Sequence, residues 1–282
     1  RLAGKEVDSG SFYNPEVSYD GKTVYFSHTG STRHRWSWTP DTTWNIFRLD
    51  LPTETEAALL TQLTDSSYND FDVCELPSGR LVFASERRGG FIRCFTENAG
   101  LRVTTSVLHT MKPDGTDIYP LSFFETSEWR PSVDNNGMLL YTRWDYTDRE
   151  NCLGSTYWTC FPDGRNPRSP HGNYPQPWFT FEDNTHGDHR WGSCPDAPSG
   201  LPMTELQFRA IPDSHRLIFT AAPHHGETFG SLCMLDLRLP DDNHMARIRR
   251  LTPYFPFPES EAPGRGQYCY GSPWPISEDL YL

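Results

Sequence analysis

The chain has 282 residues, of which 36% are hydrophobic and 14% aromatic, and its formal net charge is −12. This acidic balance disfavours non-specific binding to nucleic acid. No apolar run approaches the roughly 20 residues that a membrane-spanning helix needs. We therefore expect neither a nucleic-acid partner nor a membrane span in this segment. The length allows one large domain or two small ones.

One pattern recurs along the chain. Two runs rich in β-branched and aromatic residues, separated by a tight turn, occupy residues 14–27, 71–85, 129–142 and 208–220, and a fifth copy occupies residues 272–282. The turn glycines Gly21, Gly79 and Gly137 each follow the one before by 58 residues. Asp-Gly, Ser-Gly and Asn-Gly turns supply residues that accept positive φ, so each copy predicts a β-hairpin.

Further strands are predicted after each hairpin. Third strands are expected at residues 45–50, 108–112, 157–161 and 231–236, and a weaker fourth strand at residues 248–252. Residues 54–63 fit either a short helix or a loop, and no long amphipathic helix is expected.

A fixed period that contains strands and turns is typical of a radial β-array, in which blades stack because none can bury both faces alone. The sequence thus predicts an all-β propeller of four-stranded blades, forming a single domain over residues 1–282 with a loop insertion at about 165–203. The chain begins at Arg1 and ends within a predicted strand at Leu282. We therefore expect this segment to be an incomplete ring and a piece of a longer protein.

The seven cysteines leave the redox setting open. Cys74 and Cys233 lie in strand patterns and are predicted to be buried thiols. Cys152 and Cys160 bracket a short loop and could pair, which would indicate an oxidising compartment. No Cys-x-x-Cys occurs, so a zinc ribbon, a redox pair and covalent haem attachment are not expected in this segment.

The Asp-Gly-Lys hairpins resemble the TolB-type, WD40-like propeller repeats of bacterial periplasmic proteins. Residues 73–80, 108–116, 128–133 and 140–146, extended by 219–226 and 271–279, resemble the propeller of hydrazine synthase α-subunit-related proteins. The resemblance implies about six blades in the closed ring and a periplasmic or otherwise extracytoplasmic location. In hydrazine synthase it implies a multihaem complex with haems on Cys-x-x-Cys-His motifs, which this chain lacks.

Both free ends of a hairpin lie opposite its turn, so polar residues there should gather on one rim of the propeller. Loops and strand ends on a rigid scaffold are where binding residues concentrate. These side chains could bind a ligand or form ion pairs between blades, whereas Arg87 and Arg88 are predicted to lie in a solvated loop. The funnel-rim candidates are Asp72, Glu128, Arg130, Arg143, Asp145 and Arg209.

Four histidines could hold a divalent metal. His186 and His189 lie in the insertion, and His224 and His225 follow the fourth hairpin. Imidazole suits zinc, manganese, copper or iron, and such sites need three or four ligands. The alternative is that the histidines are scattered over the surface or hydrogen-bonded within blades.

Two functions remain open. The first is a non-catalytic extracytoplasmic module that docks partner subunits or domains of a larger protein. The second is a metal-dependent polysaccharide (uronate) lyase-like enzyme on the funnel rim, by resemblance to the propeller lyases, with a metal, a base and an arginine near the sugar acid. Fold analogy does not choose between them.

Overall fold

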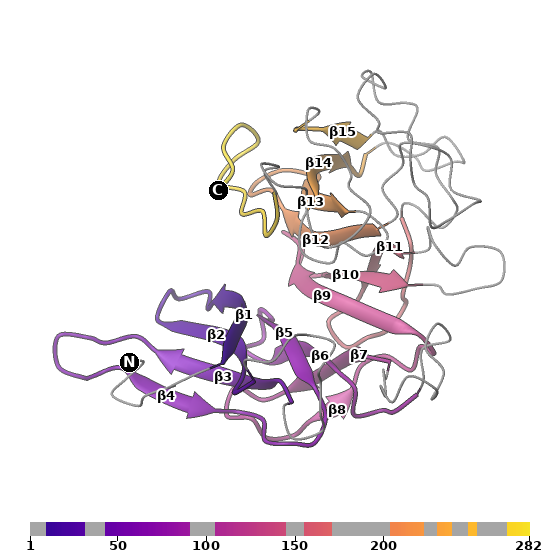
Figure 1. Ribbon diagram of the computed structural model, residues 1–282. Helices are drawn as coiled ribbons and strands as arrows, with labels where there is room; N and C mark the ends of the chain where they lie inside the picture. Colours follow the sequence, from indigo (N-terminus) through magenta and orange to yellow (C-terminus); the bar gives the residue numbers. More distant parts are fainter. Residues whose placement is uncertain are drawn as a thin grey trace. The chain divides into compact units, whose positions relative to one another are not determined.

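The structure is a computed structural model that describes residues 10–31, 43–90, 105–144, 155–170, 204–222, 230–238, 248–252 and 270–282. All regular elements in these ranges are β-strands, as the sequence predicts (Figure 1). No helix in the described part of the chain has the length and apolar character to cross a bilayer. The chain forms two compact units, Arg1–Pro131 and Ser132–Leu282. That residues 1–282 act as a single domain stays a prediction.

The first unit contains two four-stranded antiparallel sheets, each built from consecutive strands in the orders β1-β2-β3-β4 and β5-β6-β7-β8. A helix over residues 54–63 is wrong, because residues 59–62 pair with β3 and bury Leu60. The strands are β1 (Ser11–Val17), β2 (Thr23–Thr29), β3 (Asn45–Asp50), β4 (Leu59–Gln62), β5 (Asp70–Glu75), β6 (Leu81–Ser85), β7 (Val107–Met111) and β8 (Tyr119–Pro120).

The second unit holds most of a seven-stranded sheet of order β15-β14-β13-β12-β11-β10-β9. A single parallel pair, Ser155↔Thr204, links β11 to β12, so this sheet is two blades joined at one end. A short fifth hairpin over residues 272–282 is closed by the bridge Pro275↔Tyr281. The strands are β9 (Ser127–Val133), which spans the unit boundary, β10 (Leu139–Trp144), β11 (Ser155–Cys160), β12 (Thr204–Ala210), β13 (Arg216–Ala222), β14 (Ser231–Asp236) and β15 (Ile248–Arg250).

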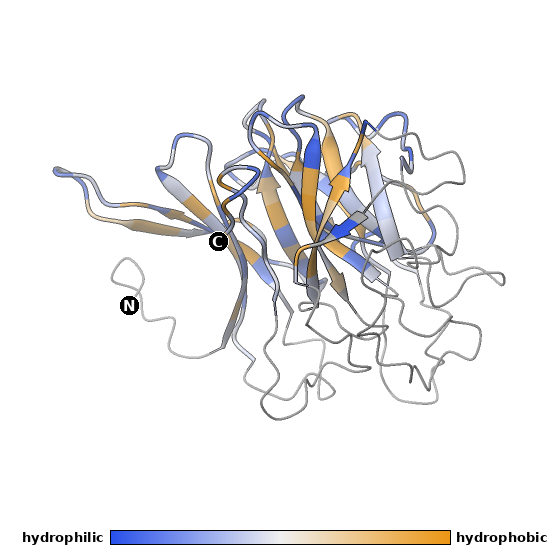
Figure 2. Cartoon of the chain, turned by 90° about the horizontal axis from the view of Figure 1, so that it is seen from above, coloured by the Kyte–Doolittle hydropathy of each residue, from blue (hydrophilic) through white to orange (hydrophobic). Residues whose placement is uncertain are grey.

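The predicted turn chemistry is confirmed. Gly21, Gly79 and Gly137 have φ of 70°, 80° and 78°, a region that only glycine adopts without strain. In the fourth hairpin Asp213 takes this conformation, with φ of 56°. In Figure 2 the hydrophobic colouring follows the strands, whereas the connecting turns are mostly hydrophilic.

Apolar side chains of neighbouring blades form the core of the first unit. One cluster joins Tyr25, Ile46 and Leu63 of the first blade to Val73, Leu81, Phe83 and Met111 of the second. Burying large side chains contributes about 1.5–3 kcal/mol each. Cys74 and Cys233 are buried as predicted.

The first strand of each hairpin contains a residue with positive φ, which the sequence pattern does not predict. The register of β1, β5 and β12 shifts at a β-bulge, and one non-glycine residue there has positive φ. Residues at the same place in β9 and in the fifth hairpin share this conformation. These five residues, hereafter the bulge residues, are Asn14, Asp72, Arg130, Gln207 and Ser272, with φ between 48° and 61°.

Candidate functional site

Five of the six predicted rim residues lie in the described part of the chain. The first unit holds Asp72, Glu128 and Arg130, and the second holds Arg143 and Arg209. The predicted residues outside the described ranges are Asp145, His186, His189, His224 and His225.

Asp72 and Arg130 are brought together, as two consecutive bulge residues. The backbone N–H of Arg130 donates a hydrogen bond of 3.1 Å to Asp72 Oδ2, and Arg130 Nη1 lies 3.4 Å from Asp72 Oδ1. The guanidinium lies 4.4 Å from the ring centroid of Tyr13 and donates a hydrogen bond to the tyrosine hydroxyl. Both charged side chains are buried. A buried charge is tolerated only when it is paired and hydrogen-bonded, so each group here requires the other.

The second unit repeats this contact without charge. The N–H of bulge residue Ser272 donates a hydrogen bond of 2.6 Å to Oε1 of bulge residue Gln207. Gln207 also accepts a hydrogen bond of 2.8 Å from the Thr220 hydroxyl and donates one of 3.2 Å to Ser272 Oγ. In both units, therefore, a bulge side chain holds the backbone of the next bulge residue.

Glu128 caps a strand. Its Oε2 accepts a hydrogen bond of 3.2 Å from the N–H of Leu108, and its Oε1 accepts one of 2.9 Å from Ser122. Thr64 and Thr252 satisfy the equivalent N–H groups in the first and fourth blades, those of Ile46 and Leu232, at 2.9 Å. In those two blades a threonine hydroxyl accepts the hydrogen bond that the Glu128 carboxylate accepts in the second blade. The contacts of Glu128 are therefore those of a strand cap.

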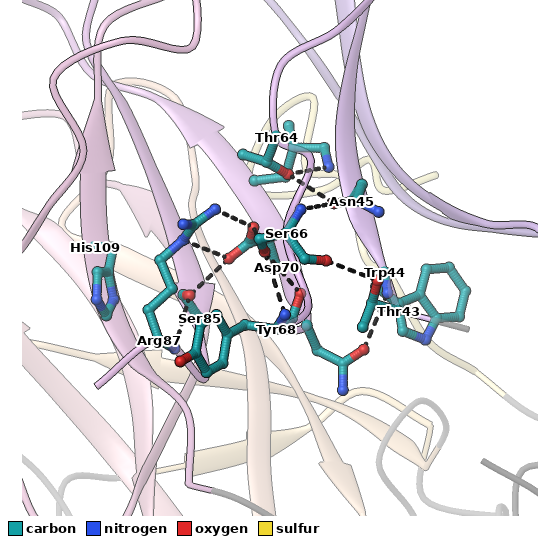
Figure 3. A network of polar contacts seen from close by, with 12 residues as sticks. Thr43, Trp44, Asn45, Thr64, Ser66, Tyr68, Asp70, Ser85, Arg87 and His109 are labelled. Atoms are coloured by element: carbon teal, nitrogen blue, oxygen red, sulfur yellow. Dashed lines mark hydrogen bonds and ion pairs between the residues drawn. The ribbon is translucent and has the colours of Figure 1, made fainter. Parts of the chain in front are cut away.

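Figure 3 shows a second ionic network, centred on the fully buried Asp70. Asp70 accepts hydrogen bonds from Ser85 at 2.6 Å, from Arg87 Nε at 3.1 Å and from Ser66 at 3.3 Å. Arg87 Nη2 lies 2.6 Å from Asp70 Oδ2. Arg87 lies in the loop after β6, as predicted, but its side chain is only partly exposed and its guanidinium binds this carboxylate in a bidentate fashion. Arg88 donates a hydrogen bond to the carbonyl of Phe124.

His109 on β7 lies beside this network (Figure 3). Its Nδ1 is 3.0 Å from the carbonyl oxygen of Val107, and its ring centroid is 5.9 Å from that of Phe83. Burial lowers the pKa of His109 below its usual value of 6.5, against the opposing effect of the Val107 carbonyl. The ring is therefore neutral at neutral pH, with the proton assigned to Nδ1 by its acceptor.

Arg143 and Arg209 each lie against an indole ring. The guanidinium of Arg143 is 4.0 Å from the ring centroid of Trp158 and donates a hydrogen bond of 3.2 Å to the hydroxyl of Tyr141. The guanidinium of Arg209 is 4.7 Å from the ring centroid of Trp274 in the fifth hairpin. Cation–π contacts of this kind contribute roughly 0.5–2 kcal/mol.

The described residues contain no group of three or more His, Cys, Asp or Glu side chains placed to hold a metal ion. The four histidines proposed as ligands lie outside those residues, so the predicted metal site stays a prediction. The carboxylates of Asp70, Asp72 and Glu128 contact guanidinium, hydroxyl and backbone N–H groups of the surrounding strands and loops.

Comparison with known proteins gives no family model and no curated protein that matches the sequence. Solved structures do match. Hydrazine synthase of Kuenenia stuttgartiensis superposes with a TM-score of 0.64 at 15% identity, over 96% of this chain and 35% of that one. The fold is that of a β-propeller. A nidogen/laminin complex matches with a TM-score of 0.50 at 14% identity, over 93% of this chain and 73% of that one.

A TolB protein of Acinetobacter baumannii matches with a TM-score of 0.42 at 13% identity, over 84% of this chain and 44% of that one. This chain spans about a third of the length of the hydrazine synthase chain. At such identities the likeness shows the propeller fold alone, and the number of blades stays a prediction.

Proposed function

We propose that this chain is a non-catalytic propeller module that docks partner subunits or domains of a larger extracytoplasmic assembly. One observation carries the proposal. The buried acidic side chains Asp70, Asp72 and Glu128 contact neighbouring strands or the next bulge residue. A catalytic acid or base needs access to a substrate proton, whereas these contacts hold the blades in place.

The proposed setting is the bacterial periplasm or another extracytoplasmic compartment, in keeping with the resemblance to TolB-type repeats and to the hydrazine synthase propeller. In this proposal the segment carries no covalent haem, because the sequence contains no Cys-x-x-Cys-His motif. A Soret band that remains with the polypeptide after acid-acetone extraction would contradict this part of the proposal.

Cross-linking of the native protein tests the docking role. The sequence has only three lysines but 37 acidic residues, so a carboxyl-reactive dihydrazide suits it better than an amine-reactive reagent. We expect exposed acidic residues to cross-link repeatedly to one other polypeptide or to another domain. Native protein that sediments alone, with no cross-link outside residues 1–282, would contradict the proposal.

Metal analysis supplies the test against the lyase alternative. A docking module should purify without a stoichiometric ion and should tolerate His224→Ala and His225→Ala with stability changes of no more than about 0.5 kcal/mol. One metal ion per chain that is lost in these variants, together with activity on uronate polymers, would overturn the proposal.

A further inference from the structure

Arg87 and Arg88 occupy a short hydrogen-bonded loop after β6. The N–H of Gly89 donates a hydrogen bond of 2.9 Å to the carbonyl of Glu86, which closes a β-turn with the two arginines at its centre. The N–H of Arg87 also donates a hydrogen bond of 3.2 Å to Ser85 Oγ. These backbone contacts fix the point from which both guanidinium groups project.

The Arg87 guanidinium is held by one of its edges. Its Nε and Nη2 donate hydrogen bonds of 3.1 and 2.6 Å to the buried carboxylate of Asp70 (Figure 3). Asp70 is itself held by the hydroxyls of Ser85 and Ser66. A guanidinium carries five N–H donors in a rigid fork. Two of the five are committed to Asp70, so the position of the group is set before any ligand binds.

The end edge of this guanidinium, formed by Nη1 and the second N–H of Nη2, is open. Nη1 has no acceptor among the described residues, and the Arg87 side chain is 24% exposed. Arg80 in the same blade differs, because its three nitrogens donate to Thr110 and to the side chain and carbonyl of Asp117. Arg87 therefore keeps a pair of parallel donors of the kind that a planar carboxylate matches.

Exposed aromatic rings belong to the two segments that hydrogen-bond to this loop. Tyr68 is 44% exposed, and the residue that follows it forms hydrogen bonds with Glu86. Phe123 is 74% exposed, and the carbonyl of the residue that follows it accepts a hydrogen bond from Arg88. A cationic edge with aromatic side chains on neighbouring segments suits a ligand that carries an anionic group beside an apolar one.

We propose that the end edge of Arg87 is a carboxylate-binding site that recognises an acidic side chain of a docked polypeptide. The inference rests on the proposed docking function and names one of its contacts. Arginine pairs with a carboxylate in bidentate geometry. Arginine and aromatic side chains are also enriched where proteins bind one another, which favours an acidic polypeptide over another source of carboxylate.

His109 supplies a local readout of ligand binding at Arg87. Burial lowers the pKa of His109, and the positive charge of Arg87 lowers it further. A carboxylate bound to Arg87 offsets that charge, so the pKa of His109 should rise on binding. The NMR signals of the His109 ring, recorded in the native, full-length protein, measure both the binding and this shift.

The probe is the peptide acetyl-Phe-Glu-Phe-amide, and its analogue with Gln in place of Glu is the neutral control. We expect saturable shifts of the His109 signals with the Glu peptide and an affinity about ten-fold lower for the Gln peptide, because charge-assisted hydrogen bonds are the stronger ones. Equal affinities for the two peptides would overturn the proposal. Saturation by galacturonate at a lower concentration than the Glu peptide would also overturn it, because that result identifies a sugar acid as the ligand.

Substitution supplies a second readout. Arg87→Met should weaken binding of the Glu peptide by about ten-fold, whereas Arg80→Met, the matched control, should leave the affinity within about two-fold. Equal losses in the two variants would overturn the proposal. If Arg87→Met fails to fold because Asp70 loses its cation, the comparison of the two peptides in the unmodified protein decides.

The outcome is separable from that of the cross-linking experiment. A cross-linked partner together with a Glu peptide that does not bind would overturn the Arg87 site and keep the docking function. Binding of the Glu peptide without any cross-linked partner would support the carboxylate site and contradict the docking function.

Discussion

The two units make the same contact between consecutive bulge residues with different chemistry. In the first unit the acceptor is the carboxylate of Asp72, and the donor residue, Arg130, also supplies the balancing charge. In the second unit the acceptor is the amide oxygen of Gln207, and the donor residue, Ser272, is neutral. All four residues have positive φ.

The repeat thus preserves the backbone geometry of the bulge residues, whereas the charge of their side chains differs between the two units. A neutral amide suffices to hold the next bulge residue, so the Asp72–Arg130 ion pair is one solution among several. Buried ion pairs are often no more stabilising than neutral replacements, but removing one partner alone leaves a buried charge and is costly.

Replacement of Arg130 should cause the largest loss in the free energy of unfolding. Arg130→Met retains the bulge and the backbone donor but leaves Asp72 buried without its cation, so we expect a loss of about 3–5 kcal/mol in the free energy of unfolding. Urea denaturation measures it. The control is Arg80→Met, which removes the more exposed ion pair with Asp117 and should cost no more than about 1 kcal/mol. Equal losses in the two variants would show that the burial of Asp72 does not matter.

Substitution of the turn glycines tests the second repeated backbone feature. Gly79→Val or Gly137→Val forces a β-branched residue into positive φ, and we expect each to cost about 1–3 kcal/mol. A Cβ atom at Gly79 meets no neighbour within 4 Å, so the cost comes from the backbone alone. Gly30→Val is the control, since Gly30 has no positive φ and also has open space. A chemical melt in which Gly79→Val matches the control would contradict the assigned turn.

The neutral contact should cost less to remove than the charged one. Gln207→Leu leaves the N–H of Ser272 and the hydroxyl of Thr220 without this acceptor, for an expected loss of about 1–2 kcal/mol. Urea denaturation of Gln207→Leu and of Arg130→Met compares the loss in unfolding free energy between the second unit and the first. A loss in Gln207→Leu as large as that in Arg130→Met would show that charge is not the source of the difference.

The smallest effect concerns pH. Since the pKa of His109 is lowered in the folded state, the unfolded chain binds more protons below pH 6.5. The stabilising contribution of neutral His109 is therefore present above this pH and falls as pH decreases toward the lowered folded pKa. His109→Leu should reduce the slope of stability against pH in this window. Urea midpoints at several pH values measure it, and an unchanged slope would contradict the assignment.

The hairpins and third strands could be predicted because their signals are local. Alternating β-branched and aromatic residues, with glycine at turns such as Gly79, specify a strand pair without distant partners. The bulges could not be predicted in this way, because Arg130 and Gln207 are not residues that sequence rules place at positive φ, a conformation that Asp72 can adopt more readily. Asp72 and Arg130 share one sequence signal, a polar residue seven places before a turn glycine, but at the equivalent place after Gln207 the sequence has Ser214.

The candidate site was predictable only in part. Asp72 and Arg130 were predicted to lie on the rim at the strand starts, whereas the structure places them inside β5 and β9 at bulges. Their pairing depends on two positions 58 residues apart in the sequence. Arg87 was missed because two adjacent arginines after a strand indicate solvent exposure, and only the fold places the buried Asp70 beside one of them.

The claim that polar side chains at the bulges hold neighbouring blades together is tested by a double-mutant cycle between Asp72→Asn and Arg130→Met. Asn keeps a side-chain acceptor for the backbone N–H but removes the charge. We predict that the two losses in unfolding free energy couple by at least about 1.5 kcal/mol, so that Arg130→Met costs much less once Asp72 is neutral. A coupling below about 0.5 kcal/mol would mean that the two residues act independently, and would contradict the account.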